Sequence, residues 1–185
     1  MRIISGKFRG QKLYAPLDNK IRPTSDRAKE MIFNTLNSIL QKKKLTYDNL
    51  SVLDCFCGSG SLGIECISRG TKNVFFVDKS LQSLNLTKKN CDLIQSNHLA
   101  KFLLSDFCCL KKNMFIANLF FLDPPYKKYK INEITNFLIS NGLIKKRTIG
   151  IIEIPKLEII SNIKDFKILK KKKISNSSFL FIEKK

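Results

Sequence analysis

A glycine-rich turn follows a short apolar stretch in the first third of the chain. Residues 53–63 read LDCFCGSGSLG, which places a G-x-G-x-x-G pattern between an expected strand and an expected helix. Glycines let the backbone turn tightly and let a ligand approach it closely. Asp78 ends the next expected strand, where a carboxylate can bind two ribose hydroxyls. The spacing predicts a nucleotide-cofactor site, against the alternative of a structural turn and a solvated strand end.

Asp54 distinguishes between two cofactor classes that share this strand, turn and helix. A carboxylate beside the glycines lies unfavourably near the pyrophosphate of NAD, because like charges repel. The same carboxylate suits the cationic amino acid end of S-adenosylmethionine, directly or through water. We therefore expect S-adenosylmethionine as the cofactor, with Asp54, Gly58 and Gly60 at the turn.

The sequence DPPY at residues 123–126 follows another apolar strand. In a doubly wound sheet the carboxyl ends of the central strands meet at one crevice, so Asp123 and the glycine turn should face the same pocket. The Asp123 carboxylate and the Pro124 carbonyl can accept hydrogen bonds from an exocyclic amine, and Tyr126 offers a flat face for its base. The paired motifs predict methyl transfer to such an amine by direct displacement. Alone, DPPY could be a loop that caps a strand.

Strands and helices alternate along the chain, which predicts a layered α/β sheet. Strands are expected at residues 51–56, 73–77, 102–104, 117–122 and 148–154, with an antiparallel pair at 166–169 and 179–182. Helices are expected at residues 25–40, capped by Thr24 or Ser25, and at 62–68, 80–95 and 132–140. The expected fold is Rossmann-like, as in class I S-adenosylmethionine-dependent methyltransferases. It has a seven-stranded, mostly parallel sheet with helices on both faces.

The N-terminal residues depart from this alternation. Residues 1–5 and 11–14 are expected as short strands around the basic loop GKFRG. We predict an appended β-hairpin arm over residues 1–24, followed by the methyltransferase domain over residues 25–185. The residues expected to contact RNA are Lys7, Phe8, Arg9, Lys12, Arg22 and Arg27. Three further cations, Arg22, Arg27 and Lys29, lie near the first helix. We expect them either to contact RNA phosphates or to close over the cofactor. The alternative is that they are solvated side chains at the start of the helix.

The basic excess of the chain is unevenly distributed. Lys plus Arg number 34 against 15 Asp plus Glu, a formal net charge of +19. Residues 51–126 hold 8 basic and 6 acidic side chains, whereas residues 1–50 hold 11 and 4 and residues 160–185 hold 8 and 2. Clustered cations bind nucleic acid by releasing counterions from its phosphates. The distribution predicts a nearly neutral core with RNA-binding flanks, against the alternative of a merely compositional Lys excess.

The six cysteines form no metal-binding pattern. The chain has no C-x-x-C pair and His98 is its single histidine, so we expect no metal. The longest apolar runs are too short to span a bilayer, and no apolar segment follows the basic N-terminus. We therefore expect a cytoplasmic protein with reduced cysteines and no membrane contact.

Four segments of the chain are typical of one known family. They are MRIISGKFRG at residues 1–10, RPTSDRAKE at 22–30 with Phe33 and Asn34, the turn at 53–63 with Glu65 and SRG at 68–70, and DPPY at 123–126. With these segments the chain resembles the bacterial 16S ribosomal RNA guanine-N2 methyltransferases of the RsmD type. The resemblance implies methyl transfer from S-adenosylmethionine to the N2 of guanine 966 in 16S rRNA of the small ribosomal subunit.

The resemblance also implies roles for single residues. Those that match the cofactor site are Asp54, Gly58, Gly60, Asp78 and Asp106. Among them, Asp78 matches the ribose acid and Asp106 the position near the adenine amine. Those that match the target-base site are Asp123, Pro124 and Tyr126. Phe8 stands where the family often has Trp, which leaves its stacking role open.

Two other functions remain open at this point. A DNA adenine-N6 methyltransferase uses the same D-P-P-Y chemistry, although the chain has no second region large enough for a DNA-recognition domain. A catalytically silent RNA-binding assembly factor needs no cofactor, whereas the intact glycine turn favours one. Nothing in the sequence suggests an obligate dimer, so we expect a monomer.

Overall fold

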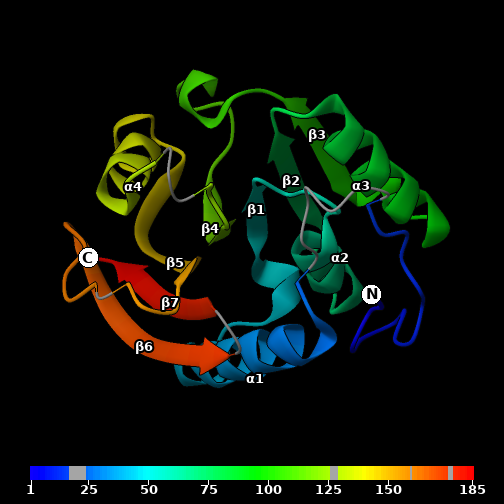
Figure 1. Ribbon diagram of the computed structural model, residues 1–185, viewed down its shortest axis with the longest axis horizontal. Helices are drawn as coiled ribbons and strands as arrows, with labels where there is room; N and C mark the ends of the chain where they lie inside the picture. The colour runs from blue at the N-terminus through cyan, green and yellow to red at the C-terminus, as the bar shows by residue number, and fades with distance from the viewer. Residues whose placement is uncertain (17–23, 126–128, 159, 175–176) are drawn as a thin grey trace.

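The computed structural model describes residues 1–16, 24–125, 129–158, 160–174 and 177–185 of the chain. Its strands are β1 (Ser51–Cys55), β2 (Asn73–Asp78), β3 (Ala100–Leu104), β4 (Ala117–Leu122), β5 (Ile144–Pro155), β6 (Phe166–Ile174) and β7 (Ser177–Lys184). They form one sheet with the order β3-β2-β1-β4-β5-β7-β6 (Figure 1). β1 to β5 run parallel, and β7 lies antiparallel between β5 and β6. The predicted seven-stranded, mostly parallel sheet is confirmed.

Four helices connect or precede these strands. They are α1 (Asp26–Lys43), α2 (Ser61–Ser68), α3 (Leu81–Leu93) and α4 (Ile131–Ser140). Of the two expected caps of α1, Ser25 is the one used, because its hydroxyl accepts the N–H of Ala28 at 3.2 Å. The helix ends at Lys43, and the following residue, Lys44, caps it in a left-handed conformation with φ 55°. The expected helices are therefore present, and their ends differ from the expected ones by at most three residues.

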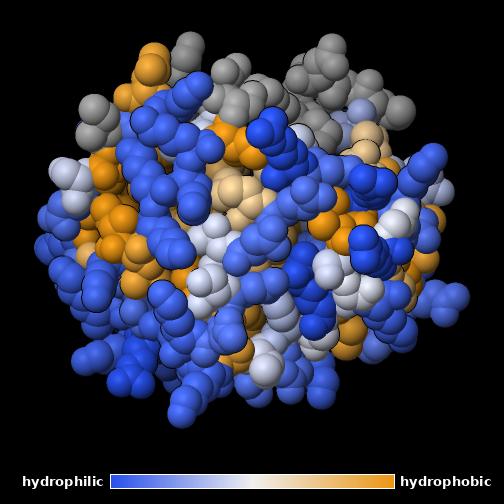
Figure 2. Space-filling view, turned by 90° about the horizontal axis from the view of Figure 1, so that it is seen from below, coloured by the Kyte–Doolittle hydropathy of each residue, from blue (hydrophilic) through white to orange (hydrophobic). Residues whose placement is uncertain are grey.

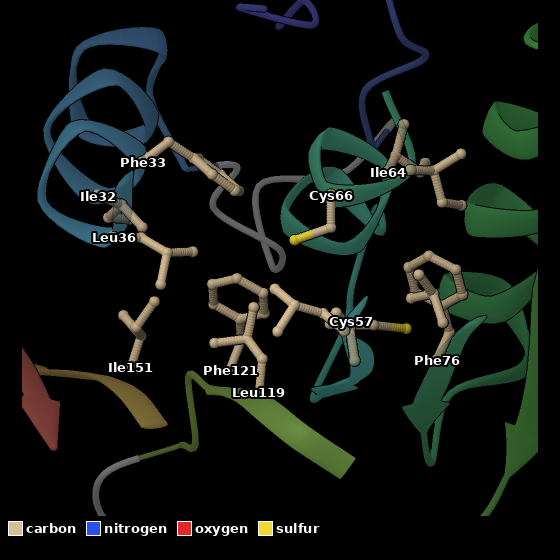
Figure 3. Close-up of a cluster of buried hydrophobic side chains, with 14 of the residues drawn as sticks. Ile32, Phe33, Leu36, Cys57, Ile64, Cys66, Phe76, Leu119, Phe121 and Ile151 are labelled. Carbon is tan, nitrogen blue, oxygen red and sulfur yellow. The ribbon is translucent and has the colours of Figure 1, made fainter. Parts of the chain in front are cut away.

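One face of the sheet packs against α1, α2 and α3. Ile32, Phe33 and Leu36 of α1 point toward Phe121 of β4 and Ile151 of β5 (Figure 3). These side chains recur at three- and four-residue spacing, which places them on one face of the helix. All five are buried, with at most 2% of their surface exposed. This layer holds β1 and β4 rigidly, and those two strands carry the glycine turn and the DPP sequence.

The other face of the sheet packs against α4 and the short turn at Phe107–Cys109. Leu53 and Cys55 of β1 lie in this second apolar cluster, whereas Val52 lies in the first. Adjacent strand residues point to opposite faces, so a strand buried on both sides must be apolar almost throughout. The predicted placement of helices on both faces is therefore confirmed.

The N-terminal hairpin, residues 1–14, contains one isolated antiparallel bridge, Arg2 to Lys12, in place of two short strands. Its backbone hydrogen bonds go partly to the rest of the protein. Ile3 is 1% exposed and Leu13 is 7% exposed, and both belong to the cluster beneath α1 and α2. In Figure 1 this segment lies beside α2 and α3, while β6 and β7 lie at the other end of the sheet. The division of the chain at residue 24 stays a prediction.

Buried charges fasten the hairpin to α2. The Glu65 carboxylate is fully buried and accepts the N–H groups of Ile4 at 2.8 Å and Ser5 at 3.0 Å. Arg69 pairs with the same carboxylate at 2.8 Å. At the end of α2, the Ser68 carbonyl accepts the N–H of Lys7 at 2.7 Å. Two of the segments that carry the family resemblance, residues 1–10 and residues 65–70, therefore meet in one network of hydrogen bonds.

Lys29 corrects one expectation from the sequence. Its side chain is fully buried, and its ammonium donates to the Arg2 carbonyl and lies 3.5 Å from the Asp26 carboxylate. Burial lowers the pKa of this ammonium, while the charge of Asp26 opposes the shift. An RNA contact for Lys29 is therefore wrong, because the residue fastens the hairpin to α1 instead.

Candidate active site

The strand register brings the predicted acids to one edge of the sheet. Cys55, the last residue of β1, pairs with Val77 of β2 and with Leu122 of β4. Asp78 and Asp123 each follow one residue later, so both lie level with the start of the glycine turn. Leu104 of β3 pairs with Asp78, and Asp106 follows two residues later. We call Asp54, Asp78, Asp106 and Asp123 the acidic cluster, and the edge where the parallel strands end the carboxyl edge.

The glycine turn depends on backbone conformations that other residues rarely adopt. Gly58 has φ 55° and Gly60 has φ 73°, both in the left-handed region. A Cβ atom on Gly60 would lie 2.4 Å from Cγ2 of Thr87 on α3. The Thr87 hydroxyl in turn donates to the Gly58 carbonyl at 3.0 Å. The turn is thus packed against α3 so tightly that a side chain on Gly60 would displace the Thr87 side chain.

Asp54 lies beneath this turn and is only 3% exposed. Its Oδ2 accepts the N–H of Gly63, in the first turn of α2, at 2.9 Å. Burial raises the pKa of Asp54 to about 7, the hydrogen bond from Gly63 opposes the shift, and the charges of Asp78 and Asp123 add to it. A cation placed beside Asp54 would therefore stabilise the ionised form of this buried carboxylate.

Asp78 stabilises the turn from the next strand. One carboxylate oxygen accepts the N–H of Gly58 at 3.0 Å, and the other accepts the N–H of Ser80 at 2.9 Å. Each carboxylate oxygen can accept a second hydrogen bond. The carboxylate therefore fixes the turn and still has acceptor capacity for hydroxyl groups at the strand end.

Asp106 lies in an aromatic corner of the site. The Tyr129 hydroxyl donates to Oδ1 of Asp106 at 2.7 Å. The Phe56 ring stacks on Phe107 with centroids 5.6 Å apart and contacts Tyr129 at 5.5 Å. Apolar rings beside a carboxylate form a suitable environment for a flat heterocycle that carries an amine. The sequence reasoning did not identify Tyr129, although it follows DPPY by only three residues.

Asp123 and Pro124 follow β4 as expected. Asp123 is exposed and Pro124 is buried. A cavity of about 50 Å³ is lined by Thr24, Asp54, Phe56, Cys57, Gly58, Ser59, Ser61, Leu62, Phe121 and Asp123. This lining joins the glycine turn to the DPP sequence, as the sequence predicted. Tyr126 and Arg22 lie outside the described residues.

Asn90 is a second residue that the sequence reasoning did not identify. Its buried amide donates to the Ser59 carbonyl in the glycine turn at 3.0 Å and to the Tyr14 carbonyl at 3.1 Å. Its Oδ1 accepts the N–H of Tyr14 at 2.8 Å. Asn90 therefore connects the hairpin to the turn. The only signal in the sequence was an Asn inside an amphipathic helix, and this signal does not reveal which residues the Asn side chain contacts.

Of the residues expected to contact RNA, Lys7, Phe8 and Arg9 lie in the hairpin loop, away from the acidic cluster. Lys7, Arg9, Lys12 and Arg27 are exposed and Phe8 is half-buried. The open end of the hairpin lies near the glycine turn, where the Ser59 hydroxyl donates to the Met1 sulfur at 3.4 Å. The loop at the other end lies against Ser68, at the far end of α2. Figure 2, viewed from below relative to Figure 1, shows a face dominated by hydrophilic side chains.

A metal centre needs clustered ligands, and a membrane span needs a long apolar helix. In the described part of the chain, no group of three or more His, Cys, Asp or Glu side chains is placed to hold a metal ion. No helix there combines the length and the apolar character needed to cross a membrane. Burial raises the pKa of the Cys57 thiol, which lines the small cavity, so the thiol remains neutral.

Comparison with known proteins places the chain in a family. The family model described as Conserved hypothetical protein 95 matches residues 1–183. The chain is 30% identical over 182 residues to Ribosomal RNA small subunit methyltransferase D of Haemophilus influenzae, covering 93% of this chain and 88% of the relative.

Two solved structures share the fold. The yhhF protein of Escherichia coli has a TM-score of 0.83 at 24% identity, covering 100% of this chain and 97% of that one. Magnesium protoporphyrin IX methyltransferase from Synechocystis, solved with bound S-adenosylmethionine, has a TM-score of 0.60 at 17% identity, covering 85% and 79%. With the family match along nearly its whole length, the chain is a methyltransferase and belongs to the Conserved hypothetical protein 95 family, that of the RsmD-type small-subunit ribosomal RNA methyltransferases.

Proposed function

We propose that the protein transfers the methyl group of S-adenosylmethionine to the exocyclic N2 of a guanine in 16S rRNA. The relative from Haemophilus influenzae is named as a small-subunit rRNA methyltransferase, and guanine 966 is the target that the family resemblance implies. The observation that carries the proposal is the acidic cluster around a glycine turn, with Asp123 and Pro124 at the same edge.

The donor set at the carboxyl edge fits a cationic cofactor. The described residues that line the small cavity include two carboxylates and no Lys or Arg. A pyrophosphate would be repelled there, whereas an ammonium or sulfonium group would be stabilised. Ligand pockets usually enclose roughly 300 to 1,000 Å³, so this cavity of about 50 Å³ would take only the amino acid end. The ribose and adenine would then extend over Asp78 and Asp106.

Each acid then has a definite role. Asp54 holds the ammonium of the cofactor, directly or through water, and becomes fully ionised as it does so. Asp78 accepts hydrogen bonds from the ribose hydroxyls with its remaining lone pairs. Asp106 accepts the adenine amine, and Phe56 and Phe107 supply the apolar surface for its ring. When bound, S-adenosylmethionine supplies an electrophilic methyl carbon and leaves as a neutral thioether.

Asp123 and Pro124 orient the target nitrogen. The two N–H groups of guanine N2 donate to the Asp123 carboxylate and the Pro124 carbonyl, which turns the nitrogen lone pair toward the methyl carbon. Transfer would form the nitrogen–carbon bond as the carbon–sulfur bond of the bound cofactor breaks, and the Asp123 carboxylate would take the proton that the nitrogen loses. Catalysis therefore depends on positioning, and no covalent enzyme intermediate is needed.

The test is methyl transfer to defined substrates. Purified protein is incubated with tritiated S-adenosylmethionine and 30S particles from a strain that lacks the enzyme, and the labelled nucleotide is mapped. We expect label in 16S rRNA at a guanine N2. Absence of label from 16S rRNA would falsify the proposal.

Two further measurements in the same series address the alternatives. Label in duplex DNA at adenine N6 would favour a DNA methyltransferase. Calorimetry that detects no binding of S-adenosylmethionine would favour a catalytically silent assembly factor.

A further inference from the structure

A second cavity lies at the amino edge of the sheet, where the parallel strands begin. It has a volume of about 910 Å³. One wall is the hairpin loop with Lys7, Phe8 and Arg9, and another is the segment that leads from the end of α2 to Lys72 before β2. The third is the segment from Leu93 to Leu99, between α3 and β3. The cavity is therefore built from three segments that are distant in sequence.

The lining of this cavity is basic. Lys7, Arg9 and Lys72 are exposed at its walls, with His98 beside them. None of the described residues that line it is Asp or Glu. Uncompensated cations around a concave surface concentrate polyanions, because a hollow focuses the field of its walls. The opposite edge of the sheet carries the acidic cluster, so the two cavities attract ligands of opposite charge.

Phe8 adds a flat apolar surface to this charged hollow. The residue is half-buried, its N–H donates to the Ser68 hydroxyl at 3.0 Å, and Lys7 Nζ lies 5.3 Å from its ring centre. Gly6 fixes the loop, because it has φ +87° and a Cβ there would lie 1.9 Å from the Ser68 carbonyl oxygen. The backbone of the loop is therefore held in place independently of any ligand. Cations next to an aromatic face are the elements that bind single-stranded nucleic acid, through phosphate contacts and base stacking.

We propose that this cavity is a second RNA-binding site, which holds a single-stranded segment of the substrate rRNA away from the target guanine. Phosphates contact Lys7, Arg9 and Lys72, and one unstacked base lies on Phe8. The proposal rests on the proposed function, because it assumes that the protein acts on rRNA. It adds Lys72 and His98 to the expected RNA surface and places that surface at the edge opposite the acidic cluster.

The geometry separates this site from the reaction. The eight residues of α2 lie between the glycine turn and the hairpin loop, and a helix of that length spans about 12 Å. A base on Phe8 is therefore not the base that is methylated. Two sites on one strand of RNA raise the overall affinity, because the second contact forms within the first complex.

The test compares two variants that remove the same charge. Arg9→Gln/Lys72→Gln removes two cations from the cavity. Lys145→Gln/Lys146→Gln removes two exposed cations near the start of β5, which belong to a different part of the surface. Binding of a 16S rRNA fragment that contains the target is measured between 50 and 200 mM salt, and methyl transfer and S-adenosylmethionine binding are measured in parallel.

For the cavity variant we expect the Kd for RNA to rise about tenfold or more. The slope of log K against log salt should become shallower by about 2, since roughly one unit is lost per phosphate contact. The turnover at saturating RNA and the affinity for S-adenosylmethionine should be unchanged. Equal effects in the two variants would overturn the proposal, because only the overall charge would then matter.

Phe8→Leu tests the stacking contact separately. Leu retains the apolar contact with the core but removes the flat ring, so we expect the Kd for RNA to rise about fivefold or more with thermal unfolding unchanged. An unchanged Kd in this variant would overturn the stacking contact. If the variant does not fold, the charge variants alone decide the proposal.

The series also distinguishes failure of this site from failure of the proposed function. Methyl transfer to rRNA with equal RNA binding by both charge variants would overturn the second site alone. RNA binding that is weakened only in the cavity variant, without methyl transfer by the wild type, would overturn the function alone. Weaker binding of 30S particles with unchanged binding of the RNA fragment would instead indicate an acidic protein surface as the partner.

Discussion

The two edges of the parallel sheet differ in the sign of their charge and in how that charge is held. At the carboxyl edge, Asp54 is buried and its pKa is raised to about 7. At the amino edge, Lys7, Arg9 and Lys72 are exposed and solvated. A buried carboxylate lowers the stability of the free protein, whereas a solvated cation costs little. The buried carboxylate at the acidic edge thus suits binding of one small cationic group. The solvated cations at the basic edge suit binding of a large and variable polyanion.

The largest effect is expected from Asp123→Ala at the acidic edge. This variant removes one of the two acceptors for the target amine, and we expect a loss of about 10³-fold or more in turnover. Binding of S-adenosylmethionine should weaken far less than turnover, because Asp54 still holds the ammonium of the cofactor and its pKa falls when the charge of Asp123 is removed. Single-turnover methyl transfer and calorimetry measure the two quantities. A parallel loss of cofactor affinity would show that Asp123 serves both ligands.

Asp54→Asn, at the same edge, should weaken cofactor binding and at the same time stabilise the free protein. The amide can still accept the N–H of Gly63 but has no charge, so we expect the Kd for S-adenosylmethionine to rise about 100-fold. The free energy of unfolding at pH 8 should increase by on the order of 2 kcal/mol, because a buried charge is removed. Denaturant unfolding of the two proteins measures this gain. A less stable variant would mean that the carboxylate is compensated in the free protein.

The stability and the cofactor affinity of the wild-type protein should both depend on pH through Asp54. The folded protein holds the proton on Asp54 up to about pH 7, whereas an unfolded Asp releases it near its usual pKa of 3.8. The stability contributed by this residue is therefore greatest at low pH and falls as pH rises from about 4 to about 7. Cofactor affinity should change in the opposite direction, increasing about tenfold from pH 6 to pH 8, and Asp54→Asn should abolish this increase.

Glu65→Gln tests whether a buried charge holds the hairpin in place at the basic edge. The new amide would face the N–H groups of Ile4 and Ser5 with a donor, so we expect a loss of about 2 to 3 kcal/mol in the free energy of unfolding. The hairpin should also become sensitive to limited proteolysis. The matched control is Glu133→Gln, whose side chain is 65% exposed and lies 4.0 Å from Lys130. Equal stability of the two variants would contradict this account of how the hairpin is held.

The smallest effect is expected from Tyr129→Phe. The variant removes the hydroxyl that donates to Asp106 and retains the ring against Phe56. If Asp106 accepts the adenine amine, one competing donor disappears, and the affinity for S-adenosylmethionine should rise about two- to fivefold. Tyr47→Phe, which removes a hydroxyl bonded to Asn37 outside the site, should leave the affinity unchanged. Weaker binding by Tyr129→Phe would instead indicate that the hydroxyl contacts the cofactor.

The strands and the acidic cluster could be predicted because their signals are local. Each central strand is an apolar run, and each acid lies within two residues of the end of its strand, so the parallel register aligns them. β5 starts at Ile144, four residues before the predicted start, since the polar residues Lys145 to Arg147 concealed its first part. The roles of Glu65, Asn90 and Lys29 could not be predicted, because their partners lie in distant segments. A buried Glu or Lys has the same sequence signature as an exposed one.

The hairpin has one more consequence, which concerns the order of protein synthesis. Its hydrogen bonds reach partners far along the chain, with sequence separations of 61 between Ile4 and Glu65 and 76 between Tyr14 and Asn90. Contacts of such separation form late, because the intervening chain must first be ordered. The hairpin residues are therefore synthesised well before their partners, and they are among the last to reach their final position. Until α3 has been synthesised, Ile3 and Leu13 have no complete apolar surface to cover.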